Sequence, residues 1–376
     1  MKVLYLSEWY PHRYDAMAGL FVRKHAEAVA RRGVDVCVLY LHRDDSVRGR
    51  EPVEQVTDGV REVYVYYRGS YLLALRAGWR YVRTHWGMPD LCQLNVITKN
   101  ALLPLYLRRR YGVPYVVVEH WTGYLPENGA YESGARLHRR LAETTVAHAS
   151  CVMAVSQMLM DNIRRVGLTH PDMRLLNNVV DDFFFRRPEP PRADARLRML
   201  HISCFDEPHK NVCGLLRAVE ALCAERKDVV LTLVGVGPDY AAVRSYADTL
   251  DLPAEALRWT GELTPEQVAA EFDRADVFVL FSNYETAGVV LSEALATGTP
   301  VISTPVGIAP DVINPQTGLM VAPGDEAALV QAMAYMADHY GDYDRDAIRR
   351  YGDQFAYRTV GDQLLKCYEQ TLRARQ

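Results

Sequence analysis

The sequence predicts an α/β protein with two domains, each built around a mainly parallel sheet. The chain has 376 residues, which is longer than one hydrophobic core normally supports. Short apolar strands alternate with amphipathic helices in both halves of the chain, as in repeated βαβ units. Between the two runs, Arg186–Arg192 holds Pro188, Pro190 and Pro191 among charged residues, a composition typical of an interdomain linker. We therefore place the first domain at residues 1–185 and the second at 186–357.

The charge pattern argues against nucleic acid as a binding partner but leaves most other classes of partner open. The formal net charge is −4, yet residues 1–190 carry 26 basic against 20 acidic side chains and the remainder carries 17 against 27. The basic first half makes anionic surfaces candidate partners for the first domain. The chain as a whole lacks the basic stripe of a nucleic-acid-binding protein.

Cysteines and acidic residues give no metal-site pattern. The seven cysteines form no C-x-x-C pair, so neither a zinc site nor a disulfide framework is indicated. We expect them to be small core residues in a reducing compartment. Asp342, Asp344 and Asp346 alternate as in a calcium loop, but Ala347 stands where such a loop needs glycine. We expect no bound metal, and we interpret the aspartates as a turn between helices.

The N-terminal residues do not read as a signal peptide, and no apolar run approaches the roughly 20 residues of a membrane span. We therefore expect a cytoplasmic protein.

The first elements form a βαβ unit. Val3–Leu6 is a short apolar strand, and a loop over Ser7–Ala18 leads to Gly19 and an amphipathic helix. Gly33 ends that helix and Val34–Leu41 is the next strand. Gly19 is not part of a G-x-G-x-x-G pattern, so the dinucleotide fingerprint is absent.

An amphipathic helix is predicted over Tyr71–Trp86, after a strand at Val60–Tyr67. Its apolar stripe comprises Leu72, Leu75, Trp79, Val82 and Trp86, flanked by Arg76, Arg80 and Arg83. We favour a helix that packs on the sheet with its arginines in water. The alternative is a helix that lies on an anionic bilayer through this stripe, which would give the first domain a peripheral membrane contact.

The strand–helix alternation then continues to a histidine. Further strands are expected at Leu91–Asn95, Tyr115–Glu119 and Cys151–Val155, with helices at Ala101–Tyr111 and Ser156–Val166. His120 follows the strand Tyr115–Glu119, at the strand end where ligands bind in such sheets. A single histidine there is more often structural, so the residue alone decides nothing.

The second domain opens with a strand over Met199–Ser203, and Lys210 precedes a helix over Val212–Ala224. A lysine just before a helix start can neutralise a diphosphate, although a solvated lysine near a turn is common. The next strand, Val229–Val234, is followed by a G-x-G without a third glycine, so nicotinamide binding is not indicated.

The most informative stretch is Phe281–Val301. A polar loop carries Glu285, Gly288 follows, and Val289–Thr297 reads as a helix with Glu293 in its second turn. A helix start at the end of a parallel strand suits a phosphate, because its amides are unpaired and its dipole is positive. At about 100° per residue the two acids cannot share one helix face. One must lie on the loop and the other on the helix, unless both are ordinary solvated glutamates.

This stretch closely resembles the signature of the family-4 glycosyltransferases, which are retaining enzymes of the GT-B fold. The matching residues are Glu285, Glu293 and the turn Gly298-Thr299-Pro300-Val301-Ile302. The resemblance implies two Rossmann-like domains that face each other across a cleft, with the donor mainly on the second and the acceptor on the first. It also implies that the terminal helix, residues 358–376, returns to the first domain.

Other segments carry the same resemblance, with departures. Gly19, His120, Lys210 and Asn178–Asp181 match positions of the family pattern. Ala18 and Val179 replace glycines of that pattern, and Phe205 stands where the family has an arginine. One expected phosphate-binding cation is therefore missing, and His201 or His209 are the candidate substitutes.

The implied reaction is transfer of a hexose from a nucleoside diphosphate sugar to a glycan or lipid-linked hydroxyl, with retention, no metal and no further cofactor. Surface polysaccharide or glycoconjugate biosynthesis is the implied context. The implied catalytic residues are His120, Glu285 and Lys210. The implied donor-binding residues are Gly19, Lys210, Glu285, Thr286, Ala287, Gly288, Val289, Val290 and Glu293. The alternatives are a nucleotide-sugar epimerase of the same architecture, or a catalytically weakened nucleotide-sugar-binding protein.

Overall fold

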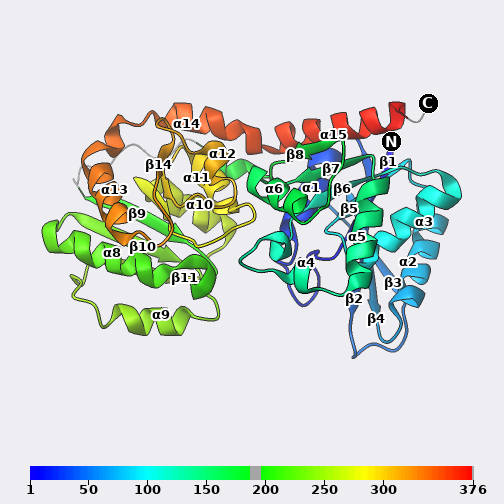
Figure 1. Ribbon diagram of the computed structural model, residues 1–376, viewed down its shortest axis with the longest axis horizontal. Coiled ribbons are helices and arrows are strands. Elements are labelled where there is room, and N and C mark those ends of the chain that lie inside the picture. Colours follow the sequence, from blue (N-terminus) through cyan, green and yellow to red (C-terminus); the bar gives the residue numbers. More distant parts are fainter. Residues whose placement is uncertain (187–195, 375–376) are drawn as a thin grey trace. The chain divides into compact units, whose positions relative to one another are not determined.

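The computed structural model describes residues 1–186 and 196–374, and the chain divides into two compact units (Figure 1). Unit 1 comprises Met1–Val179 and the residues from Tyr357 onward, and unit 2 comprises Val180–Ala356. Apart from Arg186, the predicted linker lies outside the described residues. The division falls earlier than the expected boundary after residue 185, because Phe184 is buried in the core of unit 2.

Unit 1 is built on an eight-stranded sheet. Its strands are β1 (Lys2–Ser7), β2 (Asp35–Arg43), β3 (Pro52–Thr57), β4 (Val60–Tyr67), β5 (Leu91–Asn95), β6 (Tyr115–Glu119), β7 (Cys151–Ala154) and β8 (Met173–Leu175). Their order is β3-β4-β2-β1-β5-β6-β7-β8, and every pair is parallel except β3 with β4. Val3 of β1 lies opposite Val36 of β2 on one side and Leu91 of β5 on the other. The central strands β1, β5 and β6 are buried along almost their whole length, because both faces of the sheet are covered.

The helices of unit 1 are α1 (Leu20–Ala30), α2 (Tyr71–His85), α3 (Leu102–Tyr111), α4 (Ala130–Ser133), α5 (Arg136–His148), α6 (Gln157–Arg165) and α15 (Tyr357–Arg373). The terminal helix α15 packs with α1 in one apolar cluster. Tyr357 donates a hydrogen bond to Glu27 (2.9 Å), and the hydroxyls of Tyr5 and Tyr368 lie 2.7 Å apart in the core. These contacts fix the end of the chain onto the first Rossmann-like sheet.

Helix α2 packs on the sheet, as the favoured interpretation predicted. Leu75, Trp79, Val82 and Trp86 of its apolar stripe are all buried, and only Leu72 is exposed. A Cβ at Gly78 would lie 2.8 Å from Leu39 of β2, so the helix approaches the strands closely. The alternative in which this stripe lies on a bilayer is therefore wrong. No helix among residues 1–186 and 196–374 is long and apolar enough to span a membrane.

Unit 2 contains a six-stranded, fully parallel sheet. Its strands are β9 (Leu197–Ile202), β10 (Val229–Val234), β11 (Leu257–Gly261), β12 (Val277–Leu280), β13 (Val301–Ser303) and β14 (Gly318–Met320). The order β11-β10-β9-β12-β13-β14 is third, second, first, fourth, fifth and sixth within the unit, the order of a Rossmann sheet. The strand order reverses between β9 and β12, where Leu200 lies opposite Phe278. The loops that leave these two strands therefore diverge at the edge where such folds bind ligands.

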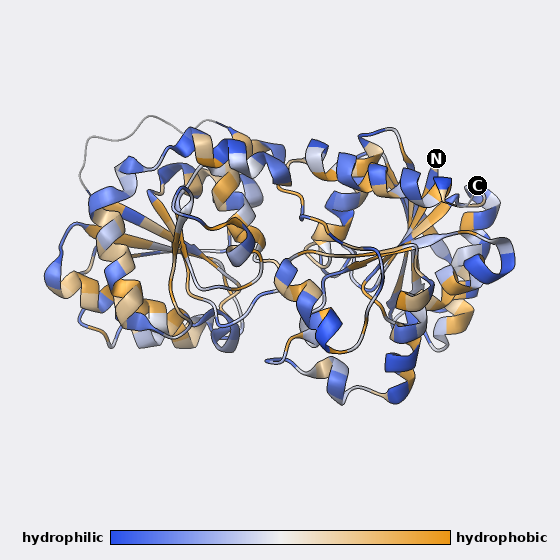
Figure 2. Ribbon diagram, turned by 45° about the horizontal axis from the view of Figure 1, so that its top comes forward, coloured by the Kyte–Doolittle hydropathy of each residue, from blue (hydrophilic) through white to orange (hydrophobic). Residues whose placement is uncertain are grey.

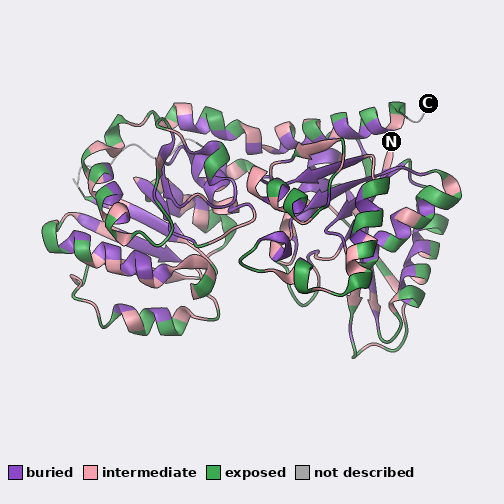
Figure 3. Ribbon diagram, viewed as in Figure 1, coloured by how far each residue is buried: buried purple, intermediate pink, exposed green. Residues whose placement is uncertain are grey.

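The helices of unit 2 are α7 (Glu207–Lys210), α8 (Val212–Glu225), α9 (Tyr240–Ala247), α10 (Pro265–Arg274), α11 (Val289–Thr297), α12 (Ala309–Val312), α13 (Glu326–His339) and α14 (Arg345–Gly352). Figure 2 shows apolar strands and helices with one apolar and one polar side. Figure 3 shows that the strands are largely buried and that the helices expose their outer faces. The expectation that every cysteine is a core residue is wrong for Cys204, which is exposed on the loop after β9.

Candidate functional site

The loops that follow β9 and β12 are bonded to each other at the switch point of unit 2. The backbone amide of Asn283 donates to the carbonyl of His209 (2.7 Å), and its side chain donates to the carbonyl of Pro208 (2.9 Å). The rings of His209 and Tyr284 meet edge to face with centroids 4.1 Å apart. The two loops therefore form one rigid surface at the carboxyl end of the sheet.

Lys210 and Glu285 meet on this surface. The Lys210 ammonium donates a hydrogen bond to Oε1 of Glu285, and Ser282 donates to the same oxygen at 3.1 Å. The side chains are only 15% and 13% exposed, respectively, so solvent screens the pair less than it screens a surface ion pair. Two residues predicted from separate motifs thus share one site. Ser282 was not anticipated as a partner of Glu285.

The loop that carries Glu285 ends at the start of α11. Gly288 is the residue before the helix and has φ +68°, and no side chain caps the first turn. A helix start without a cap leaves backbone amides at Val289 and Val290 available to a ligand. Because the macrodipole is positive at this end, the geometry favours an anion such as a phosphate.

A second glycine lets another loop pack against this one. Gly307 has φ +56°, and a Cβ on it would lie 2.5 Å from the carbonyl oxygen of Ala287. That oxygen accepts a hydrogen bond from the amide of Ile308 at 3.0 Å. Gly307 therefore fixes the backbone of Ala287 immediately before the helix start.

The two predicted acids occupy different elements. Glu285 lies on the loop and Glu293 lies on α11, and both residues are partly buried. Thr286, between them in sequence, is also half-buried and follows Glu285 on the loop. One acid therefore lies on the loop and the other on the helix, as the eight-residue spacing between Glu285 and Glu293 predicted.

The position of the missing arginine is part of the core. Phe205 is fully buried, with ring centroids 5.1 Å from Tyr240 and 6.0 Å from Trp259. His201 does not replace the cation: it is buried and hydrogen-bonded to Val279 O (2.9 Å) and Ser203 Oγ (3.0 Å). Burial lowers the pKa of His201 to about 4, so this histidine is neutral at physiological pH. His209 lies on the surface and pairs with Asp206 at 3.0 Å.

In unit 1, Gly19 opens α1 with φ +59°. A Cβ at this position would lie 2.2 Å from the carbonyl oxygen of Trp9. The glycine therefore allows the loop after β1 to fold back onto itself, a requirement that the sequence did not disclose.

His120 lies directly after β6 and contacts α1. Its ring stacks on Phe21 with centroids 4.2 Å apart, and the ring of His25 lies 5.7 Å away. Burial and the neighbouring His25 hold the pKa of His120 well below its usual range. Its Nε2 atom is buried and has no hydrogen-bond partner among the described residues. A neutral imidazole with an unpaired buried nitrogen is suited to a hydrogen bond with a bound ligand.

Two further groups around His120 were not predicted. His25 is fully buried, its Nε2 lies 3.0 Å from the carbonyl of Asn177, and burial lowers its pKa to about 4. Glu119 is buried and accepts hydrogen bonds from the Ile97 amide (2.9 Å) and the Tyr124 hydroxyl (3.0 Å). Burial raises the pKa of Glu119 to about 7. The spacing of Phe21 and His25, four residues apart on a predicted helix, could have placed both on one face.

Asn178 and Val179 are buried in unit 1, and Val180 begins unit 2. No cluster of three or more His, Cys, Asp or Glu side chains suited to a metal ion exists in the described part of the chain. Asp344 instead caps α14 by accepting from the amide of Ala347 at 2.9 Å.

Solved structures share this architecture over the whole chain. The chain superposes on a sucrose-phosphate synthase from Thermosynechococcus elongatus with a TM-score of 0.72 at 21% identity, covering 100% of both chains. It superposes on Anabaena Alr3699/HepE in complex with UDP with a TM-score of 0.72 at 18% identity, covering 98% of this chain and 100% of that one. These likenesses establish the GT-B fold, with its two parallel-sheet α/β domains.

Sequence comparisons identify the family. The profile of the family "Glycosyl transferase 4-like domain" matches residues 18–178, and that of "Glycosyl transferases group 1" matches residues 196–339. The chain is 27% identical to a glycogen synthase from Mycobacterium tuberculosis (strain CDC 1551 / Oshkosh), over 98% of this chain and 94% of the relative. It is also 27% identical to a GDP-mannose-dependent alpha-mannosyltransferase from Mycolicibacterium smegmatis, over 99% and 98%. The chain belongs to the group 1 glycosyltransferases of the GT4 type.

Proposed function

We propose that this glycosyltransferase moves a hexose from a nucleoside diphosphate sugar to a hydroxyl of a glycan or lipid-linked acceptor. We further propose that transfer retains the anomeric configuration and needs no metal ion. The observation that carries the proposal is the meeting of Lys210 and Glu285 beside the uncapped start of α11. This arrangement offers a cation, amide donors and a carboxylate within one surface of unit 2.

The diphosphate is the group that this surface suits. Lys210 and the amides of Ala287–Val290 would hold it, with Thr286 on the same loop. Negative charge grows on the diphosphate as its bond to the sugar breaks, so fixed donors aimed there lower the barrier most. Lys210 would move from Glu285 towards the phosphates as the donor binds, which frees Glu285 to accept a hydroxyl of the transferred sugar.

The remaining roles follow the family resemblance. Glu293 would accept hydrogen bonds from the ribose hydroxyls, and Gly19 would let the first loop approach the donor. His120 would hydrogen-bond the transferred sugar through its unpaired Nε2 atom. In a front-face displacement, the acceptor oxygen bonds to the anomeric carbon as the bond to phosphate breaks on the same side. The acceptor proton passes to the departing phosphate oxygen, so no side chain is consumed.

The proposal extends to the biological setting of the reaction. The acceptor would be an intermediate in the synthesis of a surface polysaccharide or another glycoconjugate in the cytoplasm. The names of relatives, which include a phosphatidyl-myo-inositol mannosyltransferase, support both glycan and lipid acceptors as classes to test.

A thermal-shift screen of nucleoside diphosphates and their sugars tests the donor site, because a ligand that binds only the folded state raises the Tm. We expect the nucleoside diphosphates of one base to raise the Tm of the wild-type protein. In the Glu293→Ala variant the same ligands should raise the Tm much less. We expect His120→Ala to retain the rise but to slow transfer. Donor conversion in the absence of acceptor would favour an epimerase, and equal, negligible effects of both variants would refute the assigned roles.

A further inference from the structure

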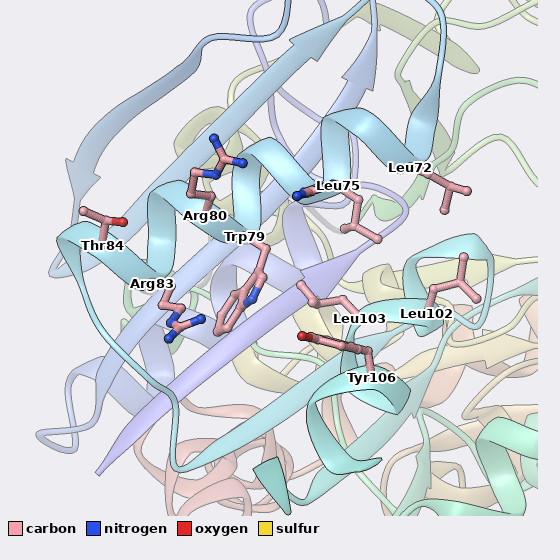
Figure 4. Close-up of a pocket in the computed structure, with 10 residues that line it drawn as sticks. Leu72, Leu75, Trp79, Arg80, Arg83, Thr84, Leu102, Leu103 and Tyr106 are labelled. Atoms are coloured by element: carbon pink, nitrogen blue, oxygen red, sulfur yellow. The ribbon is translucent and has the colours of Figure 1, made fainter. Parts of the chain in front are cut away.

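Side chains of α2 and α3 point toward one another across a groove of about 700 Å³ in unit 1 (Figure 4). Leu75, Trp79 and Leu103 line its floor and are buried, so the groove belongs to the packing of these two helices. The surface that we propose for the donor lies in unit 2 instead. Its lysine, Lys210, is carried by the four-residue helix α7, which begins with Glu207.

The chain changes direction between α7 and α8 at the residue after Lys210. Asn211 has φ +48°, a left-handed conformation that few residues other than glycine adopt. The amide of Asn211 donates to the carbonyl of Glu207 (3.0 Å), and the amide of Lys210 donates to that of Asp206 (2.8 Å). Lys210 is therefore the last residue of a short helical turn, directly before an unusual backbone conformation.

The side chain of Glu207 spans this change of direction. Its Oε2 accepts a hydrogen bond from the amide of Val212 (2.8 Å), and its Oε1 accepts one from the amide of Cys213 (2.9 Å). These residues open α8, and the first amides of a helix have no partner within it. The carboxylate also complements the positive end of the α8 dipole. Glu207 thus closes a ring that runs from Glu207 to Cys213 and contains Lys210.

The starts of α8 and α11 therefore differ. Helix α11 begins without a side-chain cap, whereas the Glu207 carboxylate occupies the first amides of α8. A phosphate at the start of α8 would meet a negative charge, and a phosphate at the start of α11 would meet backbone amides. Glu207 therefore favours α11 over α8 as the helix start that receives the diphosphate.

Glu207 is itself held from its other side. Its backbone amide donates to a carboxylate oxygen of Asp239 (2.8 Å), the residue before α9. The amide of Asp239 donates in turn to the carbonyl of Phe205 (3.0 Å). Helix α7 is thus bonded to the segment before α9 through the backbone of Glu207 and to α8 through its side chain. These bonds give the Glu207 carboxylate a fixed position.

The placement of Lys210 matters because the segment holds no other strong cation. Lys210 is the one Lys or Arg between Met199 and the start of α8. The attraction between an ammonium and a phosphate falls with the distance between them. A small displacement of Lys210 therefore weakens the positive charge that this loop offers to a phosphate.

We propose that Glu207 is a positioning residue for Lys210 and that it sets the affinity for the donor diphosphate through its bonds to the start of α8. This role rests on the proposed function, in which Lys210 holds that diphosphate. Glu207 acts through the backbone and not by contact with phosphate or sugar. Loss of its carboxylate releases the first turn of α8 and allows the backbone at Lys210 to move.

Calorimetry of the full chain with UDP, ADP and GDP tests this role, and the tightest of the three ligands is then used for the variants. Glu207→Gln keeps the size of the side chain but leaves one acceptor oxygen for two amides. We expect this variant to weaken binding about 5-fold, because the ammonium is misplaced. Lys210→Ala should weaken binding more, because it removes the ammonium altogether.

The matched control is Asp325→Asn in the same unit. Asp325 caps α13 by accepting a hydrogen bond from the amide of Ala328 (2.9 Å), so this variant also weakens a carboxylate cap. Urea unfolding should show comparable losses of stability in Glu207→Gln and Asp325→Asn. The diphosphate affinity of Asp325→Asn should equal that of the wild type.

A double variant distinguishes positioning from a general loss of structure. If Glu207 acts through Lys210, Glu207→Gln should change the affinity less than about 2-fold in the Lys210→Ala background. A loosened fold would instead weaken binding by the same factor in both backgrounds, and that result would overturn the positioning role.

Two further results would contradict this role while leaving the proposed function intact. Wild-type affinity in Glu207→Gln would show that Lys210 does not depend on the cap of α8. Tighter binding in Glu207→Gln would show that the carboxylate acts on the diphosphate through its own charge. Unchanged affinity in Lys210→Ala, by contrast, would refute the role of Lys210 in the proposed function and the positioning role with it.

Discussion

The imidazole of His120 stacks on the ring of Phe21, with centroids 4.2 Å apart and an angle of 29° between the planes. Phe21 lies in the first turn of α1, two residues after the glycine that opens this helix. The orientation of the histidine at the end of β6 therefore depends on how α1 begins. Gly19, which permits the close turn against Trp9, indirectly positions the His120 ring.

We predict that Phe21→Ala slows transfer without weakening donor binding. Loss of the stack lets the His120 ring rotate, and a misplacement of about 1 Å in an active site can cost about 10²-fold in rate. Steady-state kinetics should show a lower kcat with an unchanged donor KM. Phe21→Tyr keeps an aromatic ring in place and should retain most of the rate. Equal rate losses in both variants would contradict a positioning role.

The buried strands were predictable because their signal is local. Val60–Tyr67, Leu91–Asn95, Tyr115–Glu119 and Val229–Val234 are strands with the expected bounds. The last three are largely apolar runs, and buried parallel strands have this composition. Val60–Tyr67 was predicted instead from its alternation of apolar and polar residues. By contrast, α5 was not anticipated: only Ala142, Thr145 and Val146 of this helix are buried, so its apolar face is short. The three-residue strands β8 and β14 are too short for any pattern to identify.

The candidate site was predictable as separate residues but not as contacts. Lys210 and Glu285 were each assigned from the resemblance to the family pattern, but their ion pair depends on the pairing of β9 with β12. The contact of Phe21 with His120 likewise depends on how α1 packs against the sheet. Sequence spacing reaches only neighbours on one helix or strand. The sequence alone shows that Phe205 stands where the family pattern has an arginine. That its side chain is buried in the core was visible only in the structure.

We predict that Lys210 and Glu285 have opposite effects on nucleoside diphosphate binding. Lys210→Ala removes the cation and should weaken binding by about 10- to 10²-fold, since a hydrogen bond to a charged group contributes about 1.5–3 kcal/mol. Glu285→Gln frees Lys210 and removes a negative charge near the phosphates, so affinity should stay the same or rise. Transfer should still fall in Glu285→Gln. Calorimetry with the preferred diphosphate, alongside kinetics, measures both effects.

The double variant distinguishes direct coupling from separate roles. If the ion pair acts as a unit, the effects on unfolding free energy should be non-additive by about 0.5–3 kcal/mol. The proposed movement of Lys210 from the Glu285 carboxylate to the phosphates would be contradicted by two results together. These are additive effects of the two substitutions on stability and weaker diphosphate binding in Glu285→Gln.

We predict that Gly307→Ala impairs donor binding more than its loss of stability explains. The new methyl group would lie 2.5 Å from the carbonyl of Ala287 and would push the loop before α11. Strain of this kind costs about 1–3 kcal/mol. Gly324→Ala is the matched control, because Gly324 has φ +72° but a Cβ added there would meet no atom within 4 Å. Urea unfolding and calorimetry should show that both variants lose stability and that only Gly307→Ala loses diphosphate affinity.

The raised pKa of Glu119 makes stability depend on pH in a defined direction. The folded pKa is about 7, against an ordinary value of 4.5, because burial penalises the charged carboxylate. Between these two values the folded state binds more protons than the unfolded state. The contribution of Glu119 to stability therefore falls as pH rises from about 4.5 through 7. His25 has the opposite dependence, because its folded pKa of about 4 causes stability to be lost as pH falls below 6.5.

We predict that Glu119→Gln removes this alkaline destabilisation. The difference between the ordinary pKa of 4.5 and the folded pKa of about 7, at about 1.4 kcal/mol per pKa unit, corresponds to roughly 3.5 kcal/mol. Most of this difference lies between pH 5 and pH 8. Urea unfolding of the wild type and the variant at these two pH values should show that the variant gains stability relative to the wild type as pH rises. The exposed Glu127→Gln variant should follow the wild type at both values. A difference between wild type and Glu119→Gln that is the same at pH 5 and pH 8 would mean that Glu119 does not titrate in this range.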